Sequence, residues 1–133
     1  MADIDHFKQF NDLHGHTFGD QVIKLVANTL AKGIEKNATA ARYGGEEFSV
    51  ILPAIDLADA VNTANDLRMA IAAKKLVERS TKKDVGRITM SFGVTTYAHP
   101  EDSMAFINRA DQALYSAKKA GRNCVKHLQP STV

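Results

Sequence analysis

The chain has 133 residues, of which 44% are hydrophobic and 24% are charged, a balance typical of one folded domain and not of a disordered or fibrous chain. Its formal net charge of +2 is too small to indicate nucleic-acid binding. The single cysteine, Cys124, excludes an internal disulfide, and no apolar run reaches the ~18 to 20 residues of a membrane span. The first residues carry no targeting signal. We therefore expect one cytoplasmic domain over residues 1–133, with no membrane segment and no nucleic-acid partner.

The spacing of apolar and turn-forming residues predicts helices that alternate with short strands. In chain order we expect a loop at 13–19, a helix at 21–34, strands at 39–43 and 48–52, a helix from 56 to about 75, a solvated turn at 82–86, a strand at 88–94, a helix at 105–117 that leads to Gly121, a short strand at 123–128 and a frayed tail at 129–133. The two strands that flank Gly44-Gly45 predict a β-hairpin. This order indicates an α+β fold, or an α/β fold with an antiparallel component.

Two pairs of carboxylates stand near the ends of expected strands. Asp3 and Asp5 lie in the first five residues, and Glu46 and Glu47 follow two glycines in the hairpin. Clustered carboxylate oxygens suit Mg²⁺ or Mn²⁺, which usually keep phosphate oxygens of a substrate in their coordination shell. Acidic residues in turns are also commonly just solvated, so each pair alone leaves both interpretations open.

Four further polar residues are candidates for nucleotide binding. Asn11 and Asp20 flank the 13–19 loop, and an amide and a carboxylate that face one cavity can recognise the edge of a guanine. The structural alternatives are a turn residue for Asn11 and a plain helix N-cap for Asp20. Lys118 and Arg122 lie four residues apart near a helix end, which places them on one helix face. Such a pair either clamps a polyphosphate or complements the helix dipole.

Taken in order, several sequence blocks make the chain resemble a GGDEF-type diguanylate cyclase domain. These blocks are DIDHFKQFND at 3–12, Gly15-His16, Gly19-Asp20, RYGGEEF at 42–48, SFGV at 91–94, ADQALY at 110–115, and Lys118 with Gly121, Arg122 and Asn123. They cover nearly the whole chain in the family's order, and GGEEF is a variant of the signature loop. The resemblance implies a central, mainly antiparallel sheet covered by helices, similar to the palm of class III nucleotide cyclases, with the signature on a β-hairpin.

The resemblance also implies an activity and a role for individual residues. Members of the family condense two molecules of GTP into cyclic di-GMP and release two pyrophosphates, with Mg²⁺ or Mn²⁺ as cofactor. The implied metal ligands are Asp3, Glu47 and the Ile4 carbonyl, and Glu46 would be a further ligand or the base for the attacking 3′-hydroxyl. The other implied contacts are Asn11 and Asp20 to guanine, and the Phe7 and Lys8 backbone N–H groups, Gly44, Gly45, Lys118 and Arg122 to phosphates.

One domain of this kind holds one GTP, so the resemblance implies a homodimer with two half-sites face to face. It further implies an upstream sensory or regulatory domain, and product affinity at the active site itself. Relative to the family, the chain lacks the first helix and most of the first strand, and we expect the shortened strand to hold Asp3 loosely. Glu35 and Ala38 stand where many members carry an Arg-x-x-Asp product-inhibition site, so we expect that site to be absent.

Two alternatives to a cyclase come from other functional classes. A non-catalytic module could keep affinity for GTP or cyclic di-GMP and signal through a partner. A different nucleotidyl transferase could use the same palm fold, since a fold does not determine a function. The charged set of Asp3, Glu46, Glu47 and Lys118 favours an enzyme, because a binding module has no need of groups that act in the transition state.

Overall fold

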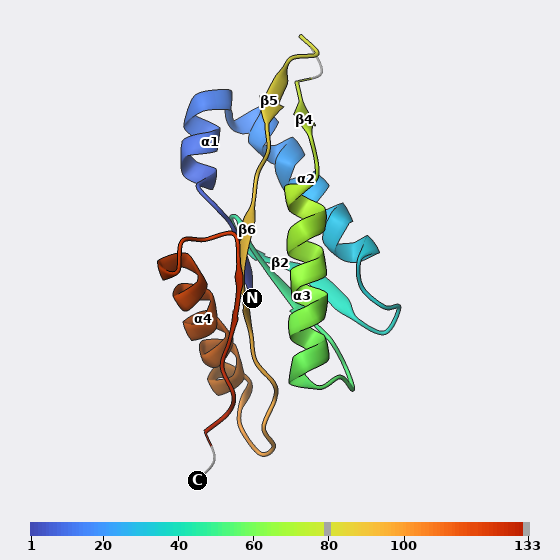
Figure 1. Cartoon of the computed structure of the whole chain (residues 1–133), viewed down its shortest axis with the longest axis vertical. Coiled ribbons are helices and arrows are strands. Elements are labelled where there is room, and N and C mark those ends of the chain that lie inside the picture. Colours follow the sequence, from blue (N-terminus) through green and yellow to red (C-terminus); the bar gives the residue numbers. More distant parts are fainter. Residues whose placement is uncertain (79–80, 132–133) are drawn as a thin grey trace.

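The computed structural model of the chain describes residues 1–78 and 81–131. In chain order its elements are β1 (Ala2–Ile4), α1 (Phe7–His14), α2 (His16–Lys32), β2 (Thr39–Gly44), β3 (Glu47–Ile51), α3 (Leu57–Ala72), β4 (Leu76–Val77), β5 (Asp84–Gly86), β6 (Met90–Val94), α4 (Ser103–Lys119) and β7 (Val125–His127) (Figure 1). No helix within the described ranges is long and apolar enough to cross a bilayer.

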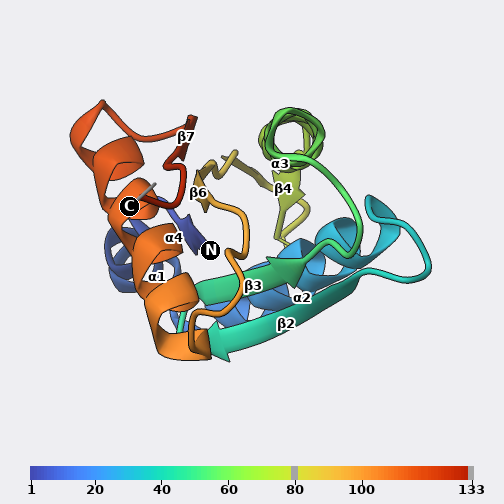
Figure 2. The ribbon, with the colours of Figure 1, turned by 90° about the horizontal axis from the view of Figure 1, so that it is seen from below.

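The central sheet has the strand order β2-β3-β1-β6-β7. Its pairings are antiparallel except for the parallel pair of β6 and β7. Helices α3 and α4 pack against β6 and β7, while α2 packs against β2 and runs along it in Figure 2. This arrangement confirms the expected α+β class, a mainly antiparallel sheet covered by helices with the signature on the β2–β3 hairpin.

The core lies between the sheet and its helices. Its largest fully buried side chains are Phe48, Ile4, Leu30, Ile71, Met90, Val22 and Val26. Strand β6 approaches α4 very closely, because a Cβ added to Gly93 would stand 2.1 Å from the backbone nitrogen of Leu114. A glycine is therefore needed where β6 crosses this helix, and the contact fixes α4 against the middle of the sheet.

The expected helices at 56–75 and 105–117 are confirmed as α3 and α4. Each begins at an aspartate N-cap: Asp56 Oδ1 accepts from the Asp59 backbone N–H at 2.8 Å, and Asp102 Oδ1 accepts from that of Ala105 at 2.8 Å. Side-chain caps of this type satisfy one of the first free N–H groups of a helix. The strands of the hairpin and the last two strands of the sheet also lie where the apolar runs predict them.

The expected loop at 13–19 is wrong, because the chain there is helical on both sides of Gly15. Helix α1 ends at His14, α2 begins at His16, and Gly15 between them has a φ of +90°. Aromatic packing holds this corner together, with the rings of Phe10 and Phe18 5.5 Å apart. Helix α2 therefore starts five residues before the expected 21–34 helix, and its interior contains Asp20.

The solvated turn expected at 82–86 is wrong in part. Asp84–Gly86 form β5, which pairs with β4 in a separate two-stranded ribbon. The backbone N–H of Glu78 donates to the Lys83 carbonyl at 2.9 Å, which extends the pairing toward the tip of this ribbon. At the other end of the chain, residues 129–131 follow β7 without regular structure, and the remaining part of the expected frayed tail, 132–133, lies outside the described residues.

Candidate functional site

The first candidate residue, Asp3, lies in the middle of the sheet. It is only 4% exposed, and its backbone pairs with Glu47 of β3 on one side and with Ser91 of β6 on the other. Its carboxylate Oδ2 accepts a hydrogen bond from the Lys118 ammonium at 2.6 Å. The expectation of a loosely held Asp3 is therefore wrong, since strand pairing on both sides and a cation from α4 fix this carboxylate.

The hairpin between β2 and β3 carries Glu46 and Glu47 to the same place. Gly45 adopts a φ of +41° in the turn, and its carbonyl accepts from the Arg42 Nε at 2.8 Å. The Ile4 backbone N–H donates to the Glu46 carbonyl at 3.2 Å, so the turn is tied directly to β1. Around Gly44 and Gly45 the space is open, because a Cβ added to either one would meet nothing within 4 Å. A ligand can therefore approach the hairpin backbone closely.

Glu46 has an unusual protonation equilibrium. Partial burial raises the pKa of its carboxyl above the ordinary value, and the charge and hydrogen bond of the neighbouring Asp3 raise this pKa further. The positive charge of Lys118 acts in the opposite direction. Glu46 therefore binds a proton more readily than an exposed glutamate does, which is a property of a group that exchanges protons with a substrate.

The donor atoms at this position match a divalent cation in type. Asp3, Glu46 and Glu47 supply carboxylate oxygens, the donors preferred by Mg²⁺ and Mn²⁺. Lys118 holds one Asp3 oxygen, so a bound cation competes with this ammonium. In residues 1–78 and 81–131, no three histidine, cysteine, aspartate or glutamate side chains are grouped closely enough to form a ready metal cage. The donor chemistry thus fits a cation that also takes ligands from its substrate.

Asp5, the second acidic residue of the first pair, faces inward and serves the structure. It is 7% exposed, and its Oδ1 accepts from the Ser91 hydroxyl at 2.6 Å. Its Oδ2 accepts from the Thr89 hydroxyl at 2.7 Å and from the Asn123 backbone N–H at 3.0 Å. Both oxygens are thus engaged, which leaves Asp3 as the carboxylate of this pair that faces the site. The two hydroxyl residues, Thr89 just before β6 and Ser91 within it, are the sequence signal for this network.

Asn11 of α1 lies beside Gly19 of α2, the residue before the exposed Asp20, but Asp20 is not an N-cap. It lies inside α2, whose N-cap is Gly15, so the structural alternative for Asp20 is wrong. Asn11 projects from α1, and its Oδ1 is a buried polar atom without a hydrogen-bond partner in the described part of the chain. This oxygen is next to Gly19, because a Cβ there would stand 1.8 Å from it. The sequence pattern predicts only a turn at Gly19, and this contact with Asn11 is visible in the structure alone.

The candidate phosphate contacts lie at the ends of α1 and α4. Phe7 and Lys8 form the first turn of α1, where backbone N–H groups have no acceptor within the helix. Lys118 lies in the last turn of α4, but Arg122 lies beyond the helix, where its φ is +66°. The placement of both residues on one helix face is therefore wrong. The chain turns back at Gly121, and the Asp5–Asn123 hydrogen bond holds the Arg122 segment close to β1.

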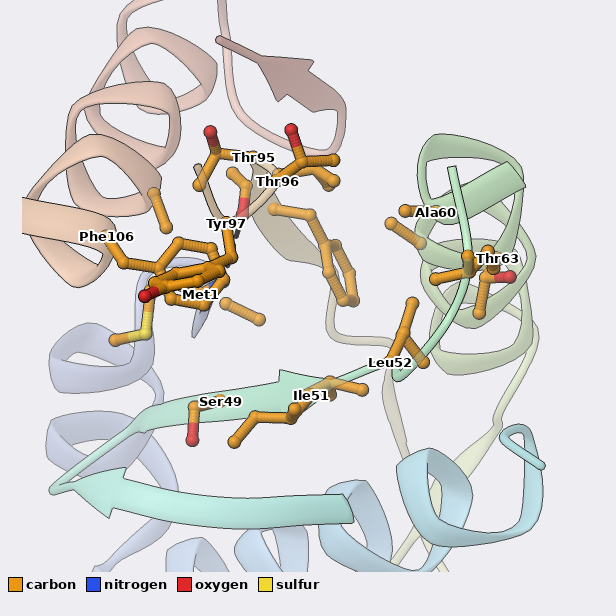
Figure 3. A pocket seen from close by; sticks show the side chains of 18 of the residues that line it. Met1, Ser49, Ile51, Leu52, Ala60, Thr63, Thr95, Thr96, Tyr97 and Phe106 are labelled. Atoms are coloured by element: carbon orange, nitrogen blue, oxygen red, sulfur yellow. Dashed lines mark hydrogen bonds between the residues drawn. The ribbon is translucent and has the colours of Figure 1, made fainter. Parts of the chain in front are cut away.

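An apolar hollow of the domain is separate from this site. It is a groove of about 560 Å³ between α3, α4 and the sheet, lined mainly by apolar side chains that include Ile51, Ala60, Phe92 and Phe106 (Figure 3). Figure 3 also shows Thr95, Thr96 and Tyr97 among the residues that line it. None of the candidate catalytic, metal, guanine or phosphate residues lines the groove.

A mainly antiparallel sheet that presents carboxylates from a central strand and a hairpin, with a lysine beside them, defines the class of palm-like nucleotide cyclases. Residues 1–124 match the family described as "Diguanylate cyclase, GGDEF domain". The chain belongs to this family, as the resemblance of its sequence blocks predicts. Membership implies a divalent cation as cofactor.

Curated and solved proteins agree with this assignment. The chain is 44% identical over 128 residues to diguanylate cyclase VdcA of Vibrio cholerae, which covers 96% of this chain and 38% of VdcA. The GGDEF domain of DgcB from Caulobacter crescentus, solved in complex with c-di-GMP, superposes with a TM-score of 0.91 at 42% identity, over 95% of this chain and 74% of that one. Diguanylate cyclase SiaD of Pseudomonas aeruginosa, solved with its activator SiaC, superposes with a TM-score of 0.90 at 32% identity, over 96% of this chain and 48% of the SiaD chain.

Proposed function

We propose that this chain is the catalytic domain of a diguanylate cyclase, which converts two GTP into cyclic di-GMP and two pyrophosphates. The observation that carries the proposal is the meeting of Asp3, Glu46 and Lys118 where β1 joins the hairpin. The chain spans 38% of VdcA, so the activity and partners of such whole proteins come to it as part of this proposal.

In the proposed reaction, the 3′-hydroxyl oxygen of one GTP attacks the α-phosphorus of the other. A P–O bond forms, the bond to the pyrophosphate breaks, and the hydroxyl proton leaves. Glu46 accepts this proton, a role that its raised pKa supports because a stronger base takes a proton more readily. Asp3, Glu47 and the Ile4 carbonyl would hold Mg²⁺ or Mn²⁺, with Glu46 as a further ligand if it is not the base, and the cation would supply charge neutralisation at the phosphates and a lower pKa of the hydroxyl.

The remaining site residues bind and orient the substrate. Lys118 and Arg122 stabilise the negative charge of the departing pyrophosphate. The Phe7 and Lys8 N–H groups and the open backbone at Gly44 and Gly45 hold phosphate oxygens. At the corner of α1 and α2, Asn11 and Asp20 hydrogen-bond the guanine edge, and the unpartnered Asn11 Oδ1 supports this assignment.

The reaction needs two copies of the chain, because each GTP supplies one hydroxyl and one α-phosphate. We propose a two-fold dimer in which the β2–β3 hairpins face each other across the two substrates. Regulation by a further domain or an activator protein fits the larger size of the relatives. With Glu35 and Ala38 at the usual inhibitory positions, product binds only in the active site, and a cytoplasmic location would supply the GTP.

Incubation of the purified chain with GTP and Mg²⁺ tests the proposal. We expect cyclic di-GMP and pyrophosphate in a ratio of one to two, measured by chromatography with mass detection and by a coupled pyrophosphate assay. ATP is the matched control substrate and should give no product, and Glu47→Gln is the matched control protein and should form product about a hundredfold more slowly. GTP binding by calorimetry without any product under these conditions would favour the binding module instead of the cyclase.

A further inference from the structure

Gly19 occupies a position where glycine is disfavoured by local structure. It is buried within α2 as the fourth residue of the helix, and helix interiors favour alanine over glycine. No turn or positive φ accounts for it, because the glycines with positive φ at this end of the chain include Gly15 but not Gly19. The reason for glycine must therefore lie in the space around it.

That space is taken by the side chain of Asn11. A Cβ added to Gly19 would stand 1.8 Å from Asn11 Oδ1 and 2.9 Å from its Cγ, both far inside van der Waals contact. The amide group of Asn11 thus lies close to Gly19 of α2, at a point where no other residue type leaves room. Glycine is the residue that permits this placement.

No hydrogen bond within the protein explains why the amide lies there. Asn11 Oδ1 is buried and has no partner among the described residues, although buried polar atoms are nearly always hydrogen-bonded. The position is therefore set by the shape of α2 and not by an internal acceptor or donor. This oxygen is shielded by α2, whereas the Nδ2 end of the same amide lies farther from Gly19 and is not a buried unpartnered atom, so Asn11 presents its N–H donors to a ligand.

We propose that Gly19 is a specificity-positioning residue of the guanine subsite. By lacking a Cβ, it lets the Asn11 amide lie against α2 next to Asp20, so that both polar groups meet the same base edge. Gly19 acts through Asn11 and does not touch the substrate. This inference rests on the proposed function, since it needs Asn11 to bind guanine.

The test is Gly19→Ala in the full chain, because this change should keep or raise stability while it lowers nucleotide affinity. The clash falls on the flexible end of Asn11, so the fold accommodates alanine by rotation of that side chain, and helix propensity favours the variant. We expect an unchanged or higher Tm. We also expect a Kd for a non-hydrolysable GTP analogue about tenfold higher by calorimetry, with the GTP-to-ATP preference reduced by the same factor.

Three comparison proteins make the result decisive. Thr17→Ala changes an exposed residue of the same helix and should leave nucleotide affinity unchanged. Asn11→Ala should weaken binding of the GTP analogue by a similar factor. Gly19→Ala added to Asn11→Ala should cause no further loss of affinity, because there is no amide left to displace. Additive losses in the double variant would overturn the proposal, since they would mean that alanine distorts the helix in general.

An independent readout separates this inference from the proposed function. In a ¹⁵N spectrum, Gly19→Ala should shift the side-chain amide of Asn11 while most backbone signals of α1 and α2 stay in place. If Asn11→Ala weakens binding of the GTP analogue and Gly19→Ala does not, the positioning role of Gly19 is wrong, and the assignment of the guanine subsite is kept. If neither variant changes GTP affinity, the guanine subsite itself is wrong, and the inference fails with it.

Discussion

Replacing Asp5 with alanine tests whether the second aspartate of the first acidic pair is a structural anchor. The carboxylate is 7% exposed and joins three segments that are distant in sequence: the end of β1, the strand β6 and the segment after α4. It does so by accepting hydrogen bonds from the Ser91 and Thr89 hydroxyls and from the Asn123 backbone N–H. In Asp5→Ala all three donors lose this acceptor inside the domain.

The size of the effect follows from these three bonds. A hydrogen bond to a charged group contributes roughly 1.5 to 3 kcal/mol, so the gross loss is about 4.5 to 9 kcal/mol. The variant also avoids burying a carboxylate, which offsets part of this loss. We therefore expect the free energy of unfolding to fall by about 3 to 5 kcal/mol, a large share of the ~5 to 15 kcal/mol typical of a domain.

Urea unfolding at pH 7, followed by far-UV circular dichroism, measures this difference directly. Ser91→Ala is the matched control, because it removes one of the three donors at a fully buried position and should cost only about 1 to 2 kcal/mol. A loss below about 1 kcal/mol in Asp5→Ala would refute the reasoning. Such a result would mean that the Asp5 carboxylate contributes little to stability. Asp5 would then be a candidate metal ligand together with Asp3.

Three further predictions concern catalysis, product and acid stability. Glu47→Gln should lower kcat about a hundredfold, equivalent to ~3 kcal/mol of lost charge stabilisation, and steady-state rates that match the parent would contradict its role as metal ligand. Cyclic di-GMP should inhibit competitively with GTP, and inhibition that persists at saturating GTP would reveal a separate product site. The hydrogen bonds from Arg109 and from the Ala98 N–H lower the pKa of Glu101 to about 2, from an ordinary value of 4.5. A carboxyl whose pKa is lower in the folded than in the unfolded chain stabilises the fold at a pH above its unfolded-state pKa. The contribution of Glu101 should therefore disappear as pH falls from about 4.5 to about 2. In Arg109→Gln, the free energy of unfolding should depend less on pH over this range.

Local signals predicted most of the fold. The aspartates that begin α3 and α4, and the glycine turn between β2 and β3, act over a few residues and are legible in the sequence. The errors arose where tertiary packing outweighs a local signal. Gly15 and Gly19 suggested a loop, but ring contacts among Phe10, His14 and Phe18 stabilise two helices that meet there.

The candidate site shows the same division between local and distant information. The residue types alone predict its carboxylates, but their convergence depends on the antiparallel register that sets Asp3 opposite Glu47. No spacing within the sequence encodes that register, nor the hydrogen bond from Lys118 to Asp3 across 115 positions. The role proposed for Gly19 is harder still to predict, because it depends on an atom that is missing. A glycine within a helical pattern suggests only that something lies close by, and the position of Asn11 is needed to say what that is.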